Sequence, residues 1–250
     1  MVEKNRMIGK LAGVAAGLAL AVSQTAGADT LRYDGAFFSP YLSDSFTIHD
    51  GDPTVLDKNV KAGAFLMTDT SGSTLPADTS FRAWCVDIYD TISSSTDYTL
   101  KSGGDFYGGA NSYKVEDLER LASYVFDNGL LTNNVRSAGF QLAVWEIVNE
   151  LSTAAAYRID EAGGGDFYVT GIDTVDEGDA FGFATTWLGV VNEGTYAISQ
   201  TLSVWDKDCP SCTQDLAVFA IPEPETYAML LAGIGLLGFV AHRRRKGAGG

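Results

Sequence analysis

The C-terminal segment of the chain constrains the protein most, because it has the three parts of a membrane-directed tail. A proline-punctuated stretch, Ile221 to Glu225, precedes the uncharged run Tyr227 to Ala241, and four cations, Arg243 to Lys246, follow soon after. The prolines hold the first part extended. As a helix, the second part would be about 22 Å long, against a hydrocarbon core of about 30 Å. A buried core helix rarely lacks a polar face and then ends in four cations. The pattern therefore predicts a short transmembrane helix with its basic end in the cytoplasm.

Residues Ile221 to Lys246 resemble the PEP-CTERM sorting signal of Gram-negative bacteria. The motif Pro222, Glu223 and Pro224, the apolar helix and the basic stop occur in the order that this signal requires. The resemblance implies that an exosortase recognises the tail in the inner membrane and cleaves it near the Pro-Glu-Pro motif. It also implies transfer to the cell surface or the extracellular matrix, usually in bacteria that form biofilms and make exopolysaccharide.

The N-terminus predicts export as well. The apolar run Leu11 to Val22 follows three cations and leads to the small residues Ala26-Gly27-Ala28. This is the pattern of a secretory signal peptide over residues 1–28, which the Sec translocon would export and signal peptidase would remove after Ala28. An uncleaved N-terminal anchor is the alternative. The exported region is then 29–220, and the sorting signal occupies 221–246.

The exported region is strongly acidic. Between Asp29 and Ile221 it has 10 basic and 29 acidic residues, a net charge of −19. Such a surface repels nucleic acid and anionic membranes, so we expect neither as a partner. Calcium binding is an open alternative at Asp50-Gly51-Asp52 and at Asp173, Asp176, Glu177 and Asp179, but neither group has EF-hand spacing. We expect no metal and no cofactor.

Most of the exported region has a β pattern, with short runs rich in Thr, Tyr, Phe and Val between Gly, Asp and Ser clusters. Predicted strands include Ala64 to Thr68, Phe81 to Ile88, Thr195 to Trp205 and Asp215 to Ile221. Apolar residues at helical spacing predict helices over Val115 to Asn128 and Ser137 to Leu151. Glu161 to Gly182 is rich in Gly and Asp, which predicts a long loop or loose hairpin. The fold class is α+β, a β-rich sandwich or barrel-like domain with a small helical part.

The chain has three cysteines, and their spacing limits the covalent chemistry that we expect. Cys209 and Cys212 are separated by two residues, and in an exported protein we expect them to form a local disulfide. Cys85 then has no partner. It is either a buried apolar residue of a strand, a nucleophile, or one end of a covalent cross-link.

A conventional enzyme is not expected. A cysteine or serine hydrolase needs an imidazole base, and the chain has only His49 and His242, of which His242 lies in the tail. No P-loop, zinc-ligand cluster or G-x-S-x-G elbow is present. A secreted hydrolase that works through carboxylates, with Asp87, Asp90 and Glu146 as candidates, is a distant alternative.

Two short motifs resemble the thioester domains of Gram-positive surface adhesins. Trp84-Cys85-Val86-Asp87 matches an aromatic-Cys-apolar-acid strand motif, and Gln141-Leu142-Ala143-Val144-Trp145 matches a helical Gln motif, with a similar helix from Leu118 to Gly129 between them. Phe140 stands where that family usually has threonine. The resemblance implies an internal thioester that joins Cys85 and Gln141. Trp145 lies one helical turn beyond Gln141, so its ring is expected to shield the bond from water.

These observations predict an exported surface or exopolysaccharide-associated protein that attaches covalently. The Cys85 thiolate would attack the Gln141 amide carbonyl and expel ammonia, and a target amine or sugar hydroxyl would then be acylated by Gln141. The resemblance implies protein amines as acceptors. The alternative is a passive structural protein of the surface or biofilm matrix, with the same fold and a reduced, buried Cys85.

Overall fold

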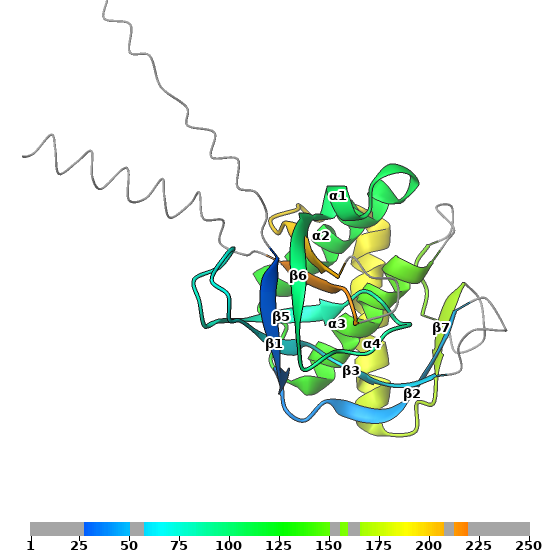
Figure 1. The fold of residues 1–250 in the computed structure, drawn as a ribbon. Coiled ribbons are helices and arrows are strands. Elements are labelled where there is room, and N and C mark those ends of the chain that lie inside the picture. Colours follow the sequence, from blue (N-terminus) through cyan, green and yellow to red (C-terminus); the bar gives the residue numbers. More distant parts are fainter. Residues whose placement is uncertain (1–27, 51–57, 151–155, 160–165, 208–212, 220–250) are drawn as a thin grey trace, which may run out of the picture.

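The computed structural model describes residues 28–50, 58–150, 156–159, 166–207 and 213–219 (Figure 1). The strands are β1 (Asp29–Ala36), β2 (Leu42–Asp50), β3 (Lys58–Ala62), β4 (Phe65–Asp69), β5 (Thr79–Cys85), β6 (Ser95–Ser102), β7 (Phe167–Thr170), β8 (Leu202–Asp206) and β9 (Leu216–Phe219). The helices are α1 (Gly103–Phe106), α2 (Ser112–Asp127), α3 (Asn134–Asn149) and α4 (Val175–Glu193), with a short 3₁₀ turn, η1 (Gly109–Asn111), before α2.

Six antiparallel strands form a closed barrel in the order β1-β4-β5-β9-β8-β6. Because alternate residues of a strand face opposite sides, each strand contributes one set of side chains to the barrel core. Phe81 of β5 stacks on Trp205 of β8 at 6.0 Å between ring centroids, although β9 separates the two strands. Closure leaves no free sheet edge for aggregation along these strands.

A second sheet, in the order β3-β2-β7, lies beside the barrel, and α3 contacts both. This helix packs against β5 of the barrel and against all three strands of the small sheet, and α2 and α4 cover it (Figure 1). Its residues from Ser137 to Ile147 are all buried, on every side of the helix. A helix that is apolar all round must be surrounded by protein. Helix α3 is therefore the central element of the fold.

Helix α4 begins and ends with clear sequence signals. Thr174 accepts a hydrogen bond from the backbone N–H of Glu177 at 3.3 Å, and the Glu177 carboxylate accepts one from the Thr174 N–H at 2.8 Å. This is a capping box, which satisfies the first free N–H groups of the helix. At the other end, Gly194 adopts a left-handed conformation with φ of 66°.

The predicted β-rich α+β class is confirmed in its coarse form. The two predicted helices are present, each beginning three residues earlier than expected. The loop predicted over Glu161 to Gly182 is wrong from Phe167 onward, since β7 and the first turns of α4 lie there. The predicted strand from Thr195 begins only at Leu202.

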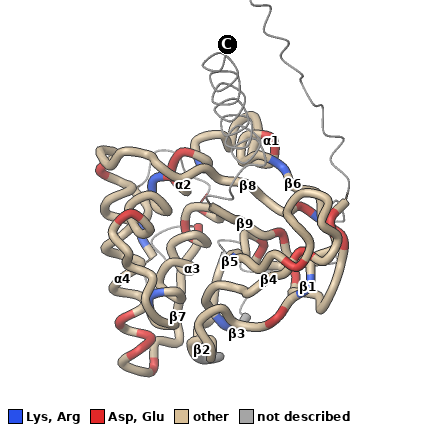
Figure 2. The backbone as a smooth tube through the Cα atoms, turned by 90° about the vertical axis from the view of Figure 1, so that its left-hand side faces the viewer, with Lys and Arg blue, Asp and Glu red and all other residues tan. Residues whose placement is uncertain are grey.

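The predicted signal peptide and the predicted membrane helix lie outside the described residues, apart from Ala28. Within the described ranges, no helix has the length and hydropathy needed to cross a membrane. The domain limits 1–28, 29–220 and 221–246 stay predictions. Acidic residues are distributed over both the barrel and the helical part, as the charge count leads one to expect (Figure 2).

Candidate functional site

Cys85 is the last residue of β5, a strand that pairs with β4 up to Ala83 and with β9 at its end. Ala83 pairs with Phe65 of β4, and Cys85 pairs with Leu216 of β9. The thiol shares a strand face with Ala83, and Trp84 points the opposite way, toward the helices. Both Cys85 and Trp84 are 1% exposed. The strand therefore fixes the sulfur in a buried position where the ladder ends.

An aromatic cluster aligns α3 with β5. The Trp84 ring lies 4.8 Å from that of Phe140 and 5.6 Å from that of Phe126, while Phe219 contacts all three. Phe140 is fully buried in this cluster. Because Trp84 and Phe140 each precede a residue of the predicted site, their packing brings Cys85 opposite Gln141.

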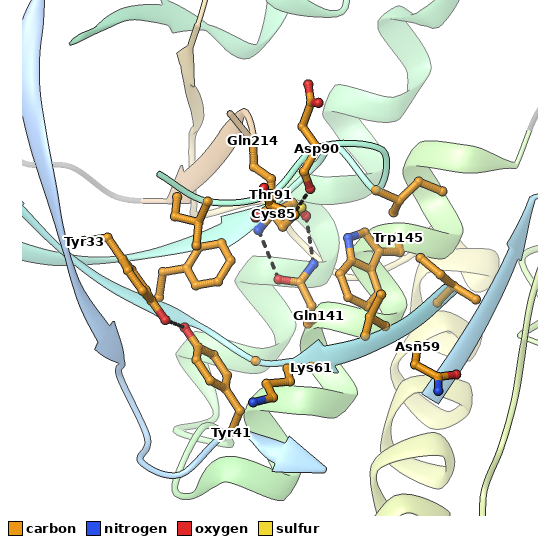
Figure 3. Close-up of a pocket in the computed structure, with 16 residues that line it drawn as sticks. Tyr33, Tyr41, Asn59, Lys61, Cys85, Asp90, Thr91, Gln141, Trp145 and Gln214 are labelled. Carbon is orange, nitrogen blue, oxygen red and sulfur yellow. Dashed lines mark hydrogen bonds between the residues drawn. The ribbon is translucent and has the colours of Figure 1, made fainter. Parts of the chain in front are cut away.

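The structure brings Cys85 and Gln141 into direct contact, although 56 residues separate them in the sequence. The backbone N–H of Cys85 donates to Gln141 Oε1 at 3.0 Å, and Gln141 Nε2 donates to the Cys85 carbonyl at 2.8 Å (Figure 3). The two bonds together assign the oxygen and nitrogen of the amide, since a flipped amide would lose both. Gln141 is 1% exposed, so this is a buried, fully oriented side chain rather than a surface glutamine.

The Cys85 thiol is protonated in its resting environment. Its Sγ donates to the carbonyl oxygen of Asp87 at 2.6 Å. Burial raises the pKa of the thiol to about 12, and the Trp145 side chain and the Asp87 backbone act in the opposite direction. Asp215 is the residue immediately before β9, and burial raises the pKa of its carboxyl to about 6. A desolvated site of this kind disfavours charge on the sulfur until a donor compensates it.

A cavity of about 260 Å³ opens beside the Cys85–Gln141 pair. Tyr33, Tyr41, Phe65 and Trp145 form its aromatic lining. The hydroxyls of Tyr33 and Tyr41 lie 3.0 Å apart and face each other (Figure 3). Cys85 and Gln141 both belong to the wall of this cavity.

Polar residues also line this cavity, and of these the sequence had singled out Asp90, as a candidate of the hydrolase alternative, but not Lys61 or Gln214. Lys61 comes from β3, Asp90 from the segment after β5, and Gln214 from the segment before β9. Gln214 Nε2 donates to the Asp90 carbonyl at 2.7 Å, while its Oε1 is buried and has no hydrogen-bond partner among the described residues. The only sequence signal for Gln214 was its place before a predicted strand, which does not tell which strand is its neighbour.

The other candidate residues have structural partners. Glu146 is fully buried, and its Oε1 accepts from the backbone N–H of Arg158 at 2.6 Å. Asp87 Oδ1 accepts from the N–H of Tyr89 at 2.8 Å. Asp90 lines the cavity. The three acidic residues of the hydrolase alternative therefore lie in different environments.

His49 belongs to the small sheet. Its ring stacks on Tyr168 at 4.2 Å between centroids, and Nε2 lies 2.8 Å from the hydroxyl of Thr170. Through these contacts the imidazole packs against β7. Among the described residues, His49 therefore does not form a Cys-His pair with Cys85.

Of the calcium alternatives, Glu177 serves the capping box of α4. Within the described ranges, no group of three or more His, Cys, Asp or Glu side chains is arranged to hold a metal ion. Asp52, together with Cys209, Cys212 and the sorting residues Pro222, Glu223 and Pro224, lies outside the described part of the chain.

Comparisons with known proteins found one similarity in the tail and one among solved structures. The family described as the PEP-CTERM protein-sorting motif matches residues 220–245, so the chain carries this motif. Among solved structures, the N-terminal thioester domain of fibronectin-binding protein SfbI from Streptococcus pyogenes is similar at 12% identity and a TM-score of 0.42. That similarity covers 73% of this chain and 96% of the other. No curated protein matches the chain.

Proposed function

We propose that this exported protein attaches covalently to a surface or matrix target through an internal thioester between Cys85 and Gln141. The sorting motif implies an exported, membrane-anchored precursor in a Gram-negative bacterium that an exosortase processes. The cell surface or the extracellular matrix is the proposed destination. The protein acts once and does not turn over, so we propose no enzymatic activity.

The single observation that carries the proposal is the two-point binding of the Gln141 amide by the Cys85 backbone. The N–H of Cys85 already donates to Gln141 Oε1, the oxygen that becomes negative when sulfur adds to the amide carbon. A preorganised donor at that atom is the arrangement that stabilises a tetrahedral intermediate. The second bond, from Nε2 to the Cys85 carbonyl, orients the nitrogen that must leave.

The proposed chemistry balances without a cofactor. The thiol loses its proton and Sγ adds to the Gln141 amide carbon. The carbon–nitrogen bond then breaks, and nitrogen leaves as ammonia with the proton that the thiol gave up. An amide is a poor acyl donor, so the reaction depends on proximity. Well-oriented intramolecular reactions reach effective molarities of about 10⁵–10⁸ M, which suits two groups bound to one another in a dry site.

The acceptor approaches through the cavity. Its amine or hydroxyl attacks the thioester carbonyl, forms an amide or ester with the Gln141 carbonyl carbon, and releases Cys85 as a thiol. The aromatic lining of the cavity excludes bulk water from a bond that water would otherwise hydrolyse. Target proteins with exposed amines and polysaccharides with free hydroxyls are the two acceptor classes.

A passive structural role is the second candidate, and one observation favours it. The Gln141 amide pairs with the backbone of Cys85, and the thiol pairs with Asp87, so every group of the pair has a partner without any reaction. In this case the site is a buried polar clamp between β5 and α3.

The intact mass of the full chain, purified in detergent before and after treatment with methylamine, separates the two candidates. A reactive thioester predicts a chain lighter by one ammonia that gains methylamine at Gln141 and exposes a free Cys85 thiol. The Cys85→Ala variant provides the baseline, and a Cys209→Ser, Cys212→Ser variant isolates the Cys85 signal. An unaltered mass and no methylamine adduct in the wild-type chain would leave the passive role.

A further inference from the structure

The Trp145 side chain has a polar group, its Nε1–H, in addition to an apolar ring. Its side chain is 3% exposed, and its Nε1–H is buried without a hydrogen-bond partner among the described residues. Trp84 and Trp205 also have buried, unpartnered indole nitrogens within the same described ranges, so this feature alone distinguishes nothing. What distinguishes Trp145 is its surroundings.

Among the described residues, Trp145 is the tryptophan that lines the cavity beside the reacting pair. It follows Gln141 by four residues on α3, and such residues lie on the same side of a helix. Figure 3 shows the nitrogen-bearing edge of the ring turned toward Cys85. The pKa of the Cys85 thiol responds to this neighbour, since Trp145 lowers it against the larger effect of burial. A buried donor is therefore aimed at the sulfur.

We infer that Trp145 Nε1–H acts as a hydrogen-bond donor to Cys85 Sγ when negative charge develops on the sulfur, as the thioester forms and as it opens. The inference rests on the proposed thioester for its chemical role, and on the geometry of the site for the placement of an unused donor beside the sulfur.

Sulfur carries charge at two moments of the proposed reaction. When the bond forms, the thiol gives up its proton, which ends on the departing ammonia, and sulfur becomes electron-rich as it attacks. When an acceptor amine attacks the thioester, the carbon–sulfur bond breaks and sulfur leaves with the electron pair, then takes the proton that the amine loses. Burial opposes charge at both moments. An indole N–H compensates it without adding a titratable group, and without water.

The two roles of Trp145, cover and donor, predict different results for two substitutions. Trp145→Phe keeps an aromatic ring over the bond but removes the N–H, and Trp145→Leu removes both. A donor predicts that Trp145→Phe slows the reaction with methylamine about 10- to 100-fold, the range expected for a hydrogen bond to a charged group. Hydrolysis by water should stay as slow as in the wild type. A cover alone predicts that Trp145→Phe reacts like the wild type, which would overturn the inference.

A matched control is available on α4. Trp187 is 2% exposed and stacks on Phe183 at 5.6 Å, outside the cavity. Trp187→Phe removes an equally buried indole, and we expect it to leave the methylamine rate unchanged. A slower rate in that control would assign the loss to general packing and overturn the donor role.

An independent measurement keeps the inference testable if no thioester forms. In the full chain with ¹⁵N-labelled tryptophan, the indole resonance of Trp145 should move when Cys85 is replaced by Ala, while that of Trp187 should not. An unmoved Trp145 resonance overturns the inference whatever the mass measurement gives. A wild-type chain that has lost no ammonia overturns the proposed function instead, and the resonance then decides the contact alone.

Discussion

Replacing Gly139 with Ala should test whether the closeness of α3 and α4 sets the position of Gln141. A Cβ at Gly139 would lie 2.7 Å from the Ala180 carbonyl oxygen and 3.0 Å from Phe183 Cβ. Ordinary contacts begin at 3.4 Å, so the helices must separate by about 0.7 Å. The carbonyl belongs to the α4 backbone and cannot rotate away. Helix α3 must therefore move with the Gln141 side chain.

The magnitude follows from two opposing effects. Overpacking a buried contact costs about 1–3 kcal/mol, and Ala in place of Gly in a helix gains up to about 1 kcal/mol. We expect a net loss of about 1–2 kcal/mol in the free energy of unfolding, measured by urea denaturation of the full chain in detergent. Because a shift of about 1 Å in a reacting group costs about 100-fold in rate, thioester formation should slow by at least about tenfold.

Gly182 provides the control, because it lies in α4 and a Cβ added there would meet no atom within 4 Å. Gly182→Ala should stabilise the protein by about 0.5–1 kcal/mol through helix propensity alone. If Gly139→Ala is instead as stable as Gly182→Ala and forms the thioester at the wild-type rate, the close packing of α3 on α4 does not position Gln141, and the reasoning is wrong.

Four further outcomes are expected. Gln141→Leu leaves the buried N–H and C=O of Cys85 without partners and should lower the free energy of unfolding by about 2–4 kcal/mol in urea denaturation. Thr174→Ala removes the capping box of α4 and should cost about 1 kcal/mol in the same assay. In a chain that has not formed the thioester, the Cys85 thiol should resist iodoacetamide at about pH 8 in the native state and react after unfolding, because burial raises its pKa to about 12; modification of the native thiol, followed by mass spectrometry, would contradict this. The Asp215 carboxyl has a folded-state pKa raised from 3.8 to about 6 by burial, so its ionisation destabilises the fold progressively as pH rises across that window. The free energy of unfolding of Asp215→Asn should therefore rise relative to that of the wild type between about pH 4 and 6, and the difference should stay constant above about pH 6. A difference between the two proteins that does not change with pH would refute the assignment.

The sequence predicted the two motif-bearing elements because each has a strong local pattern. Apolar residues at helical spacing indicated the helices around Leu118 and Gln141, and the β-rich run around Cys85 indicated a strand. Helix α4 was missed because Gly178, Gly182 and Gly189 lower its helix propensity. The Thr174–Glu177 capping box was the signal that could have located its start.

The site itself depends on contacts that no local pattern contains. Cys85 and Gln141 meet because Trp84 packs on Phe140, a contact between residues distant in the chain. Gln214 reaches the cavity because β9 pairs with β5, and that pairing was not predicted. The first contact depends on how α3 packs on the barrel and the second on the order of the barrel strands. Neither can be derived from the alternation of residues within each strand.

The position of β9 has a mechanical consequence for a protein held at a surface. This strand is the last described element before the sorting segment, and it lies between β5 and β8 with antiparallel pairing on both sides. A pull on the chain after Phe219 acts along the strand, while its hydrogen bonds lie across that direction. The bonds on both sides are then loaded together in shear rather than opened one at a time. Tension on the C-terminal end passes directly to β5, the strand that ends at Cys85, so a tether and a covalent attachment point would be joined through two adjacent strands.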